Sequence, residues 1–250
     1  MTESTGPAPR QETGGPNRTP RSEIKSLRKR NRKYEPVLLL DLSTSMDWST
    51  TDEQDRSHDY PSVMSRRAVV TSALPILITA LAKEDSEAEE EQSGGSDDLG
   101  GLMTFGFASQ PVKIGDLNES NAERKLQKVQ WGGGTYVVPA LKMAVAKYDE
   151  EFEDDEDGSR VHEILILTDG EAADAHELEP YLMAANANRV YAIGIVGHGD
   201  AALDTYNSYK KVADANQKAD EFGKAHVHVV LFDGVSDPAE IAGDLVELAA

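Results

Sequence analysis

Residues 37–45 constrain the fold of this chain more than any other stretch. Four consecutive apolar residues run directly into Asp41, and Ser43 and Ser45 follow at alternate positions. An apolar run without polar alternation is typical of a strand that is buried on both faces of a parallel sheet. In open α/β sheets, ligands bind at the carboxyl ends of the strands, which is where Asp41 is expected to lie. The stretch therefore predicts a parallel α/β fold with a candidate site at the end of its first strand.

A second stretch repeats this arrangement. Residues 164–167 are apolar and run into Thr168, Asp169 and Gly170. Further strands are expected at 101–108, 110–117, 190–196 and 227–232, and helices at 65–83, 121–129, 138–148, 178–188, 203–222 and from 238 onward. Strands that alternate with helices predict an α/β fold, with a doubly wound, mostly parallel central sheet and helices on both faces. The segment 110–117 is expected to be a hairpin partner at the sheet edge.

Composition divides the chain into a basic tail and an acidic domain. Residues 1–33 carry nine Lys and Arg against three Glu and have almost no core-forming side chains, so we expect them to be disordered. This tail either docks on an acidic partner or nucleic acid, or is solvated and lies against the acidic body. Residues 34–250 are expected to form one domain, with acidic insertion loops near 84–100 and 149–158. Pro75, inside an expected helix, predicts a kink or a restart there.

Charge and composition argue against several classes of function. The chain has a net charge of −20, and the part after residue 33 carries 16 basic and 42 acidic residues. Such a body does not favour nonspecific nucleic-acid binding, which relies on Lys and Arg. The absence of cysteine excludes disulfides, thiolate metal sites and cysteine nucleophiles. No apolar segment is long enough to span a bilayer or resembles a secretory signal, so we expect a cytoplasmic protein with no membrane partner.

Oxygen-bearing side chains are concentrated at the expected strand ends. Asp41, Ser43 and Ser45 follow the first strand, Asp169 follows a later one, and three glycines precede Thr135. Hydroxyl and carboxylate oxygens are hard ligands, suited to Mg²⁺, Mn²⁺ or Ca²⁺ rather than to zinc or copper. If the strand ends are neighbours, these five side chains converge on one candidate metal site.

Three short motifs in this chain resemble the von Willebrand factor type A family. They are Asp-x-Ser-x-Ser at 41–45, Gly-Gly-Thr at 133–135 and Thr-Asp-Gly at 168–170. In this order, they match the three parts of that family's metal-ion-dependent adhesion site. The resemblance covers about residues 34–250.

The resemblance implies a role for each motif residue. Ser43, Ser45 and Thr135 would offer hydroxyls to a divalent cation, commonly Mg²⁺, and Asp41 and Asp169 would act directly or through bound water. Because Mg²⁺ keeps several waters, a carboxylate from another protein can complete its shell. The expected function is therefore a metal-dependent protein-interaction module that binds an Asp or Glu of a protein partner. Intracellular members of the family often work beside ATPases or in stress-response complexes, which is an analogy at the level of the family.

Two other functions compete with this one. A metal-independent scaffold would use its acidic loops for contacts. A metal-dependent phosphohydrolase of the haloacid dehalogenase class would need a second aspartate two residues after Asp41, where this chain has Ser43. The sequence contains no nucleophile elbow, dinucleotide-binding turn or phosphate-binding loop. We therefore expect that the protein is not an enzyme.

Overall fold

The computed structural model describes residues 33–50, 65–90, 101–151, 160–170, 172–234 and 237–249. The expected basic tail lies outside these residues except for Lys33, which begins the first strand. Residues 91–100 and 152–159, which belong to the two expected acidic insertions, also lie outside them.

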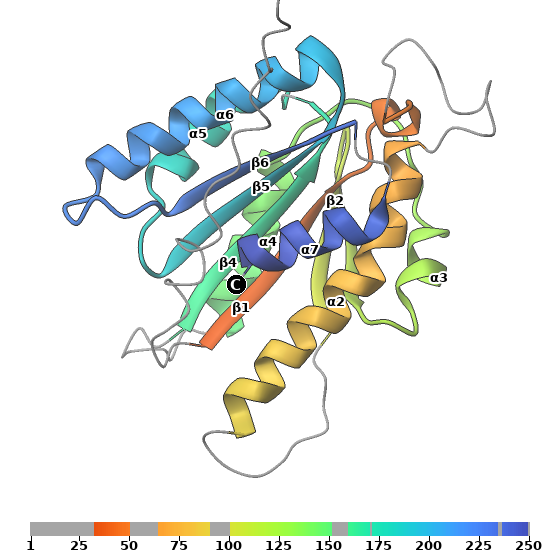
Figure 1. Ribbon diagram of the computed structural model, residues 1–250, viewed down its shortest axis with the longest axis horizontal. Helices are drawn as coiled ribbons and strands as arrows, with labels where there is room; N and C mark the ends of the chain where they lie inside the picture. Colours follow the sequence, from red (N-terminus) through yellow and green to blue (C-terminus); the bar gives the residue numbers. More distant parts are fainter. Residues whose placement is uncertain are drawn as a thin grey trace, which may run out of the picture.

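In the described part of the chain, six strands form one sheet (Figure 1). They are β1 (Lys33–Asp41), β2 (Leu102–Phe107), β3 (Pro111–Leu117), β4 (Arg160–Thr168), β5 (Arg189–Gly197) and β6 (Val227–Asp233). Their order is β3-β2-β1-β4-β5-β6, and every neighbouring pair is parallel except β2 and β3. The mostly parallel sheet and the antiparallel hairpin partner at its edge are thus confirmed.

Helices cover both faces of the sheet, as Figure 1 shows. On one face are α2 (Arg66–Glu90), α3 (Ala122–Leu126) and α7 (Pro238–Ala249); on the other are α4 (Val138–Glu151), α5 (Ala175–Met183) and α6 (Gly199–Ala219). Strand β1 serves both layers, because Leu38 and Leu40 join one core while Leu39 joins the other. This two-sided burial explains the unbroken apolar run and confirms the doubly wound α/β fold.

Several element boundaries differ from those expected. Helix α2 continues to Glu90 and so includes residues 84–90, which were expected in an acidic loop. This segment is rich in Glu and contains Ala, which favour helix, so its charge alone was a poor sign of a loop. The helix also passes through Pro75 without ending and restarting. Helix α3 is shorter than expected, with five residues.

The strand order places a switch point at β1. This strand lies between β2 and β4. After β1 the chain forms β2 and β3 on one side of it, and then β4, β5 and β6 on the other side. Leu40 pairs with Leu167 in the register of β1 and β4, which brings Asp41 and Thr168 side by side at the carboxyl edge. In open α/β sheets this is where ligands bind. In the part of the chain that the structure describes, every helix is too short or too polar to cross a membrane.

Candidate metal centre

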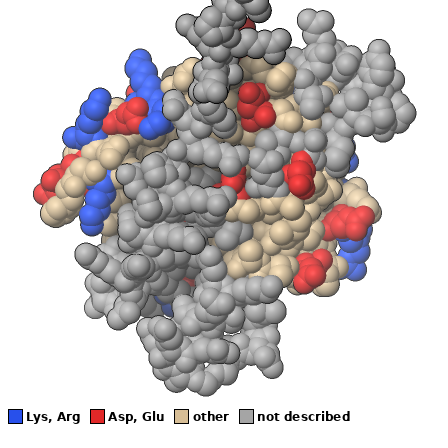
Figure 2. All heavy atoms as spheres, in the orientation of Figure 1, with Lys and Arg blue, Asp and Glu red and all other residues tan. Residues whose placement is uncertain are grey.

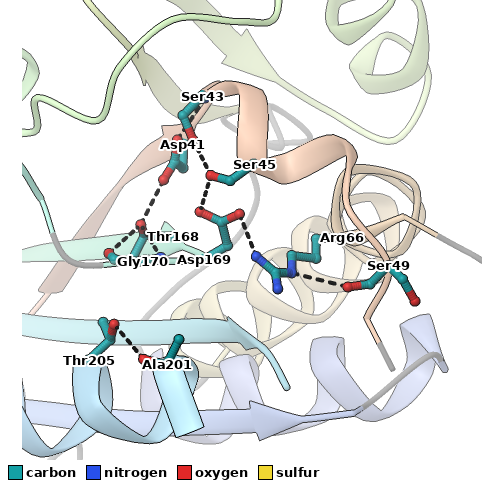
Figure 3. A network of polar contacts seen from close by, with 10 residues as sticks. All are labelled: Asp41, Ser43, Ser45, Ser49, Arg66, Thr168, Asp169, Gly170, Ala201 and Thr205. Atoms are coloured by element: carbon teal, nitrogen blue, oxygen red, sulfur yellow. Dashed lines mark hydrogen bonds and ion pairs between the residues drawn. The ribbon is translucent and has the colours of Figure 1, made fainter. Parts of the chain in front are cut away.

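Asp41 is the last residue of β1, and its side chain is completely buried. The backbone N–H of Ser43 donates to its Oδ1 at 2.7 Å. The Thr168 hydroxyl, at the end of β4, donates to Oδ2 at 2.7 Å (Figure 3). The first bond is a local turn of the kind that Asp favours, whereas the second joins two neighbouring strands. Thr168 is therefore part of the site, although the sequence marked it only as a member of the Thr-Asp-Gly motif.

A chain of hydroxyl contacts connects the two motifs that follow β1 and β4. The Oγ atoms of Ser43 and Ser45 lie 3.1 Å apart, and the Ser45 hydroxyl donates to Asp169 Oδ1 at 2.9 Å (Figure 3). Ser45 has a single hydroxyl hydrogen, and a carboxylate only accepts, so Ser43 must be the donor in the serine pair. Ser45 lies in the short 3-10 helix η1 (Thr44–Asp47), which turns it back toward the sheet.

Asp169 also forms a buried ion pair that the sequence did not predict. Its Oδ2 accepts from Arg66 Nη1 at 2.9 Å, and the two side chains are 1% and 4% exposed. Arg66 is the first residue of α2, 103 positions earlier in the chain. No motif in the sequence marks this arginine, because its partner is set by how α2 packs beside the strand ends.

The glycine-rich loop before α4 lies against the end of β1. Gly132 N–H donates to Leu42 O at 2.6 Å, and Gly133 N–H donates to the Thr44 hydroxyl at 3.0 Å. Gly133 has φ +103, and a Cβ there would lie 2.6 Å from Ser109 Oγ. Glycine is the residue that fits a backbone of this conformation so close to another segment of the same chain.

This loop brings Thr135 to the same edge of the sheet. The Thr135 carbonyl accepts from Ala173 N–H at 2.7 Å, which connects it to the segment after Asp169. Within the ranges that the structure describes, the Thr135 hydroxyl forms no hydrogen bond, and the residue is partly buried.

Asp174 fixes the start of the helix that follows Thr135. Its two carboxylate oxygens accept from the backbone N–H groups of Val137 and Val138 at 3.0 and 2.9 Å. Asp174 is buried, so these bonds offset the loss of its hydration. No sequence pattern predicts this role, since Asp174 and the start of α4 are distant in the chain.

The electrostatics of the site favour a cation beside Asp41. Burial, and then repulsion from Asp169, raise the pKa of Asp41 to about 6, while hydrogen bonds from Ser43 and Thr168 oppose that rise. Asp169 has a cationic partner in Arg66, whereas Asp41 has only hydrogen-bond donors in the described part of the chain. A divalent cation would offset this uncompensated charge.

The donor set fits a hard cation. It combines two carboxylates with three hydroxyls, which is the ligand type of Mg²⁺, Mn²⁺ or Ca²⁺. Within the described ranges, no three His, Cys, Asp or Glu side chains form a group that could hold a metal ion, so any site here depends on the hydroxyls. The structure thus brings all five sequence-predicted residues, Asp41, Ser43, Ser45, Thr135 and Asp169, to one edge of the sheet.

No protein-family model matches the chain, and no curated protein matches its sequence. Similar solved structures include a mutant of the PilB minor pilin from Streptococcus sanguinis, with a TM-score of 0.57 and 10% identity over 88% of this chain and 62% of the pilin. The VWA domain of SpRpn10 has a TM-score of 0.52 and 10% identity over 85% of this chain and 94% of that domain. BatB from Bacteroides thetaiotaomicron has a TM-score of 0.50 and 15% identity over 87% of this chain and 98% of that protein. This chain therefore has the fold of the von Willebrand factor type A domains.

Proposed function

We propose that this protein is a metal-dependent protein-interaction module. The observation that carries the proposal is the convergence of three separate motifs on one edge of the sheet, with Ser43, Ser45 and Asp169 in a continuous chain of hydrogen bonds. Ser43, Ser45 and Thr135 would provide neutral oxygens, and Asp41 and Asp169 would provide negative charge. When bound, Mg²⁺ (or Mn²⁺ or Ca²⁺) supplies a position that an Asp or Glu of a partner can occupy in place of water.

The rim of the site supports a protein partner. Tyr136 follows Thr135 directly, and its side chain is 44% exposed. Thr44, which is bonded to the glycine-rich loop, is also exposed. Exposed tyrosines beside a polar centre are common anchors of protein interfaces. On the face that Figure 2 shows, described Lys and Arg side chains lie over α6 and near α3, with acidic side chains between them, so these described cations do not form one continuous basic surface.

We propose binding rather than catalysis. Among the described residues, no histidine is hydrogen-bonded to any of the five candidate ligands, so none of the described histidines is placed as the base of a hydrolase there. Ser43 stands where a haloacid dehalogenase phosphatase would have its second aspartate. A scaffold without metal remains the competing function, and metal dependence of partner binding distinguishes the two.

Calorimetric titration of Mg²⁺ and Mn²⁺ into metal-free protein tests the metal site. We expect saturable binding to the wild type and at least about a tenfold loss of affinity in Asp41→Ala and Thr135→Ala, since each removes one ligand group. Asp149→Ala and Thr79→Ala are matched controls, because Asp149 pairs with Arg189 and Thr79 bonds within α2, both apart from the site. Equal losses in the controls would contradict the assignment.

Capture of partner proteins in Mg²⁺ or in EDTA tests the function. We expect capture that requires Mg²⁺ and is lost in Asp41→Ala and Thr135→Ala. Partners that bind equally in EDTA and to both variants would establish the metal-independent scaffold instead.

A further inference from the structure

Arg66 lies inside the candidate metal centre, where a positive charge is unexpected. Its guanidinium forms a buried ion pair with Asp169, as Figure 3 shows. A buried pair of this kind bears a large cost of dehydration, which only good geometry offsets. The position and the charge of Arg66 therefore both bear on how the site can bind a cation.

Three contacts with the segment after β1 fix the position of Arg66. Its Nε donates to Ser49 O at 3.2 Å, and its guanidinium lies 5.7 Å from the ring centroid of Trp48. Its backbone N–H donates to Trp48 O at 2.9 Å. A guanidinium held by a carbonyl, an aromatic ring and a carboxylate is preorganised and has little freedom to leave.

Arg66 also determines how Asp169 can act. Both oxygens of Asp169 have partners, since Oδ1 accepts from Ser45 and Oδ2 accepts from Arg66. Asp169 thereby orients the Ser45 hydroxyl, whose hydrogen points to the carboxylate. One lone pair of Ser45 Oγ accepts from Ser43, and the other remains for a further partner. Asp169 is thus a positioning residue that acts through Ser45, and Arg66 keeps it in that role.

The charge of Arg66 reduces the attraction of the site for cations. With both carboxylates ionised, Asp41, Asp169 and Arg66 together carry a net charge of −1, whereas the carboxylates alone would carry −2. Coulomb interactions inside a protein are much less screened than in water. A fixed guanidinium on Asp169 therefore repels a divalent cation that binds at Ser45.

We propose that Arg66 is a built-in counter-ion that lowers the affinity of this site for divalent cations and holds Asp169 on Ser45. The inference rests on the proposed metal site. As a consequence, the free protein would bind a cation weakly, and the protein would bind it more tightly when a partner supplies a carboxylate. Binding of the cation and of the partner are then coupled, and each raises the affinity for the other.

Titration of Mn²⁺ into metal-free wild type, Arg66→Met and Arg160→Met tests this inference. We expect Arg66→Met to bind Mn²⁺ at least about tenfold more tightly than the wild type, because the repulsion is removed. Arg160→Met loses the same charge at the opposite end of β4, where Arg160 lies 4.0 Å from Glu35. Its affinity should remain within about threefold of the wild type.

A double variant identifies Asp169 as the residue through which Arg66 acts. In Arg66→Met/Asp169→Asn the gain should disappear, since loss of one positive and one negative charge returns the net charge of the site to −1, as in the wild type. If circular dichroism shows that Arg66→Met does not fold, Arg66→Gln replaces it, because a neutral amide can still donate to Asp169.

The outcomes separate this inference from the proposed function. Equal Mn²⁺ affinities in wild type and Arg66→Met would overturn the role of Arg66 and leave the metal site intact. Binding to Arg66→Met but not to the wild type would support the role of Arg66 and contradict metal binding by the free wild-type protein. Absence of binding in both would overturn both proposals.

Discussion

The ends of β1 and β4 share one sequence pattern but differ in their electrostatics. Each strand is an apolar run with an aspartate at its carboxyl end, Asp41 in one and Asp169 in the other. Asp169 has a guanidinium partner, whereas Asp41 is bonded to Ser43 N–H and the Thr168 hydroxyl. The same pattern thus places two carboxylates at one edge of the sheet, but a positive side chain offsets only the charge of Asp169 among the described residues.

This difference shows what an adjacent helix contributes to a strand end. Arg66 reaches Asp169 because α2 begins beside it, whereas no described cation reaches Asp41. Burial and the charge of Asp169 then raise the pKa of Asp41 to about 6. A bound cation would therefore stabilise the negative charge of Asp41 more than that of Asp169, because Arg66 already offsets the charge of Asp169.

The largest expected difference in the free energy of unfolding is between the variants Asp169→Ala and Asp41→Asn. Asp169→Ala leaves the Arg66 guanidinium buried without its partner, and breaking such a pair costs about 3–5 kcal/mol of unfolding free energy. Asp41→Asn should change that free energy by less than about 1 kcal/mol, because an amide keeps the acceptor for Ser43 N–H and can donate to Thr168. Urea denaturation in EDTA at pH 7 measures both values. Losses of equal size would remove the contrast between the two strand ends.

A smaller effect is expected from Thr168→Val, which removes a donor from Asp41 together with the contacts of the same hydroxyl to the Gly170 backbone. Valine has the shape of threonine but cannot donate to Asp41 Oδ2, so a buried carboxylate oxygen loses its partner. Hydrogen bonds to charged groups contribute about 1.5–3 kcal/mol, and we expect a loss of that size in urea denaturation. Thr205→Val is the matched control, because that buried hydroxyl donates to Ala201 O within its own helix. A loss as large in Thr205→Val would show that the effect is not specific to Asp41.

The smallest expected effect is the pH dependence that comes from Asp41. Its pKa is higher in the folded protein than the ordinary 3.8, so the folded state binds a proton more readily than the unfolded state. Stability therefore falls as the pH rises from about 4 to about 6. Between pH 5 and pH 7 this contribution amounts to about 1 kcal/mol.

Comparison of the metal-free wild type with Asp41→Asn isolates this contribution. Burial lowers the pKa of His162 to about 3 and that of His228 to about 4, so both histidines reduce stability as the pH falls below 6.5. They oppose Asp41 in the same range, but they are present in both proteins and cancel in the difference. The wild type should gain stability relative to Asp41→Asn when the pH falls from 7 to 5. A constant difference would show that Asp41 is ionised as easily in the folded state as in the unfolded state.

Much of the fold could be predicted because its strands are buried on both faces. Residues 37–40 and 164–167 are apolar without interruption, and they lie in β1 and β4, the two central strands. Helix ends were less predictable. Residues 84–90 continue α2, since charge marks solvent exposure and not the end of a helix. The acidic character of a segment therefore does not distinguish an exposed helix from a loop.

The candidate site was predictable to the extent that its residues belong to short motifs. Asp41, Ser43 and Ser45 are neighbours in the chain, and their position after a strand follows from the local pattern. Arg66 and Asp174 could not be found in this way. Each acts on a residue at least 36 positions away, and no spacing rule relates them to their partners.

The amino-acid sequence is enough to predict the parallel α/β fold and to locate two carboxylates and three hydroxyls at expected strand ends and loops. Hydrophobic periodicity and turn residues are local properties, so they can be read without a structure. Three properties follow only from the folded arrangement: the pairing of Arg66 with Asp169, the orientation of Ser45 and the raised pKa of Asp41. These properties depend on burial and on distances between charges, and both arise only when segments far apart in the chain pack together.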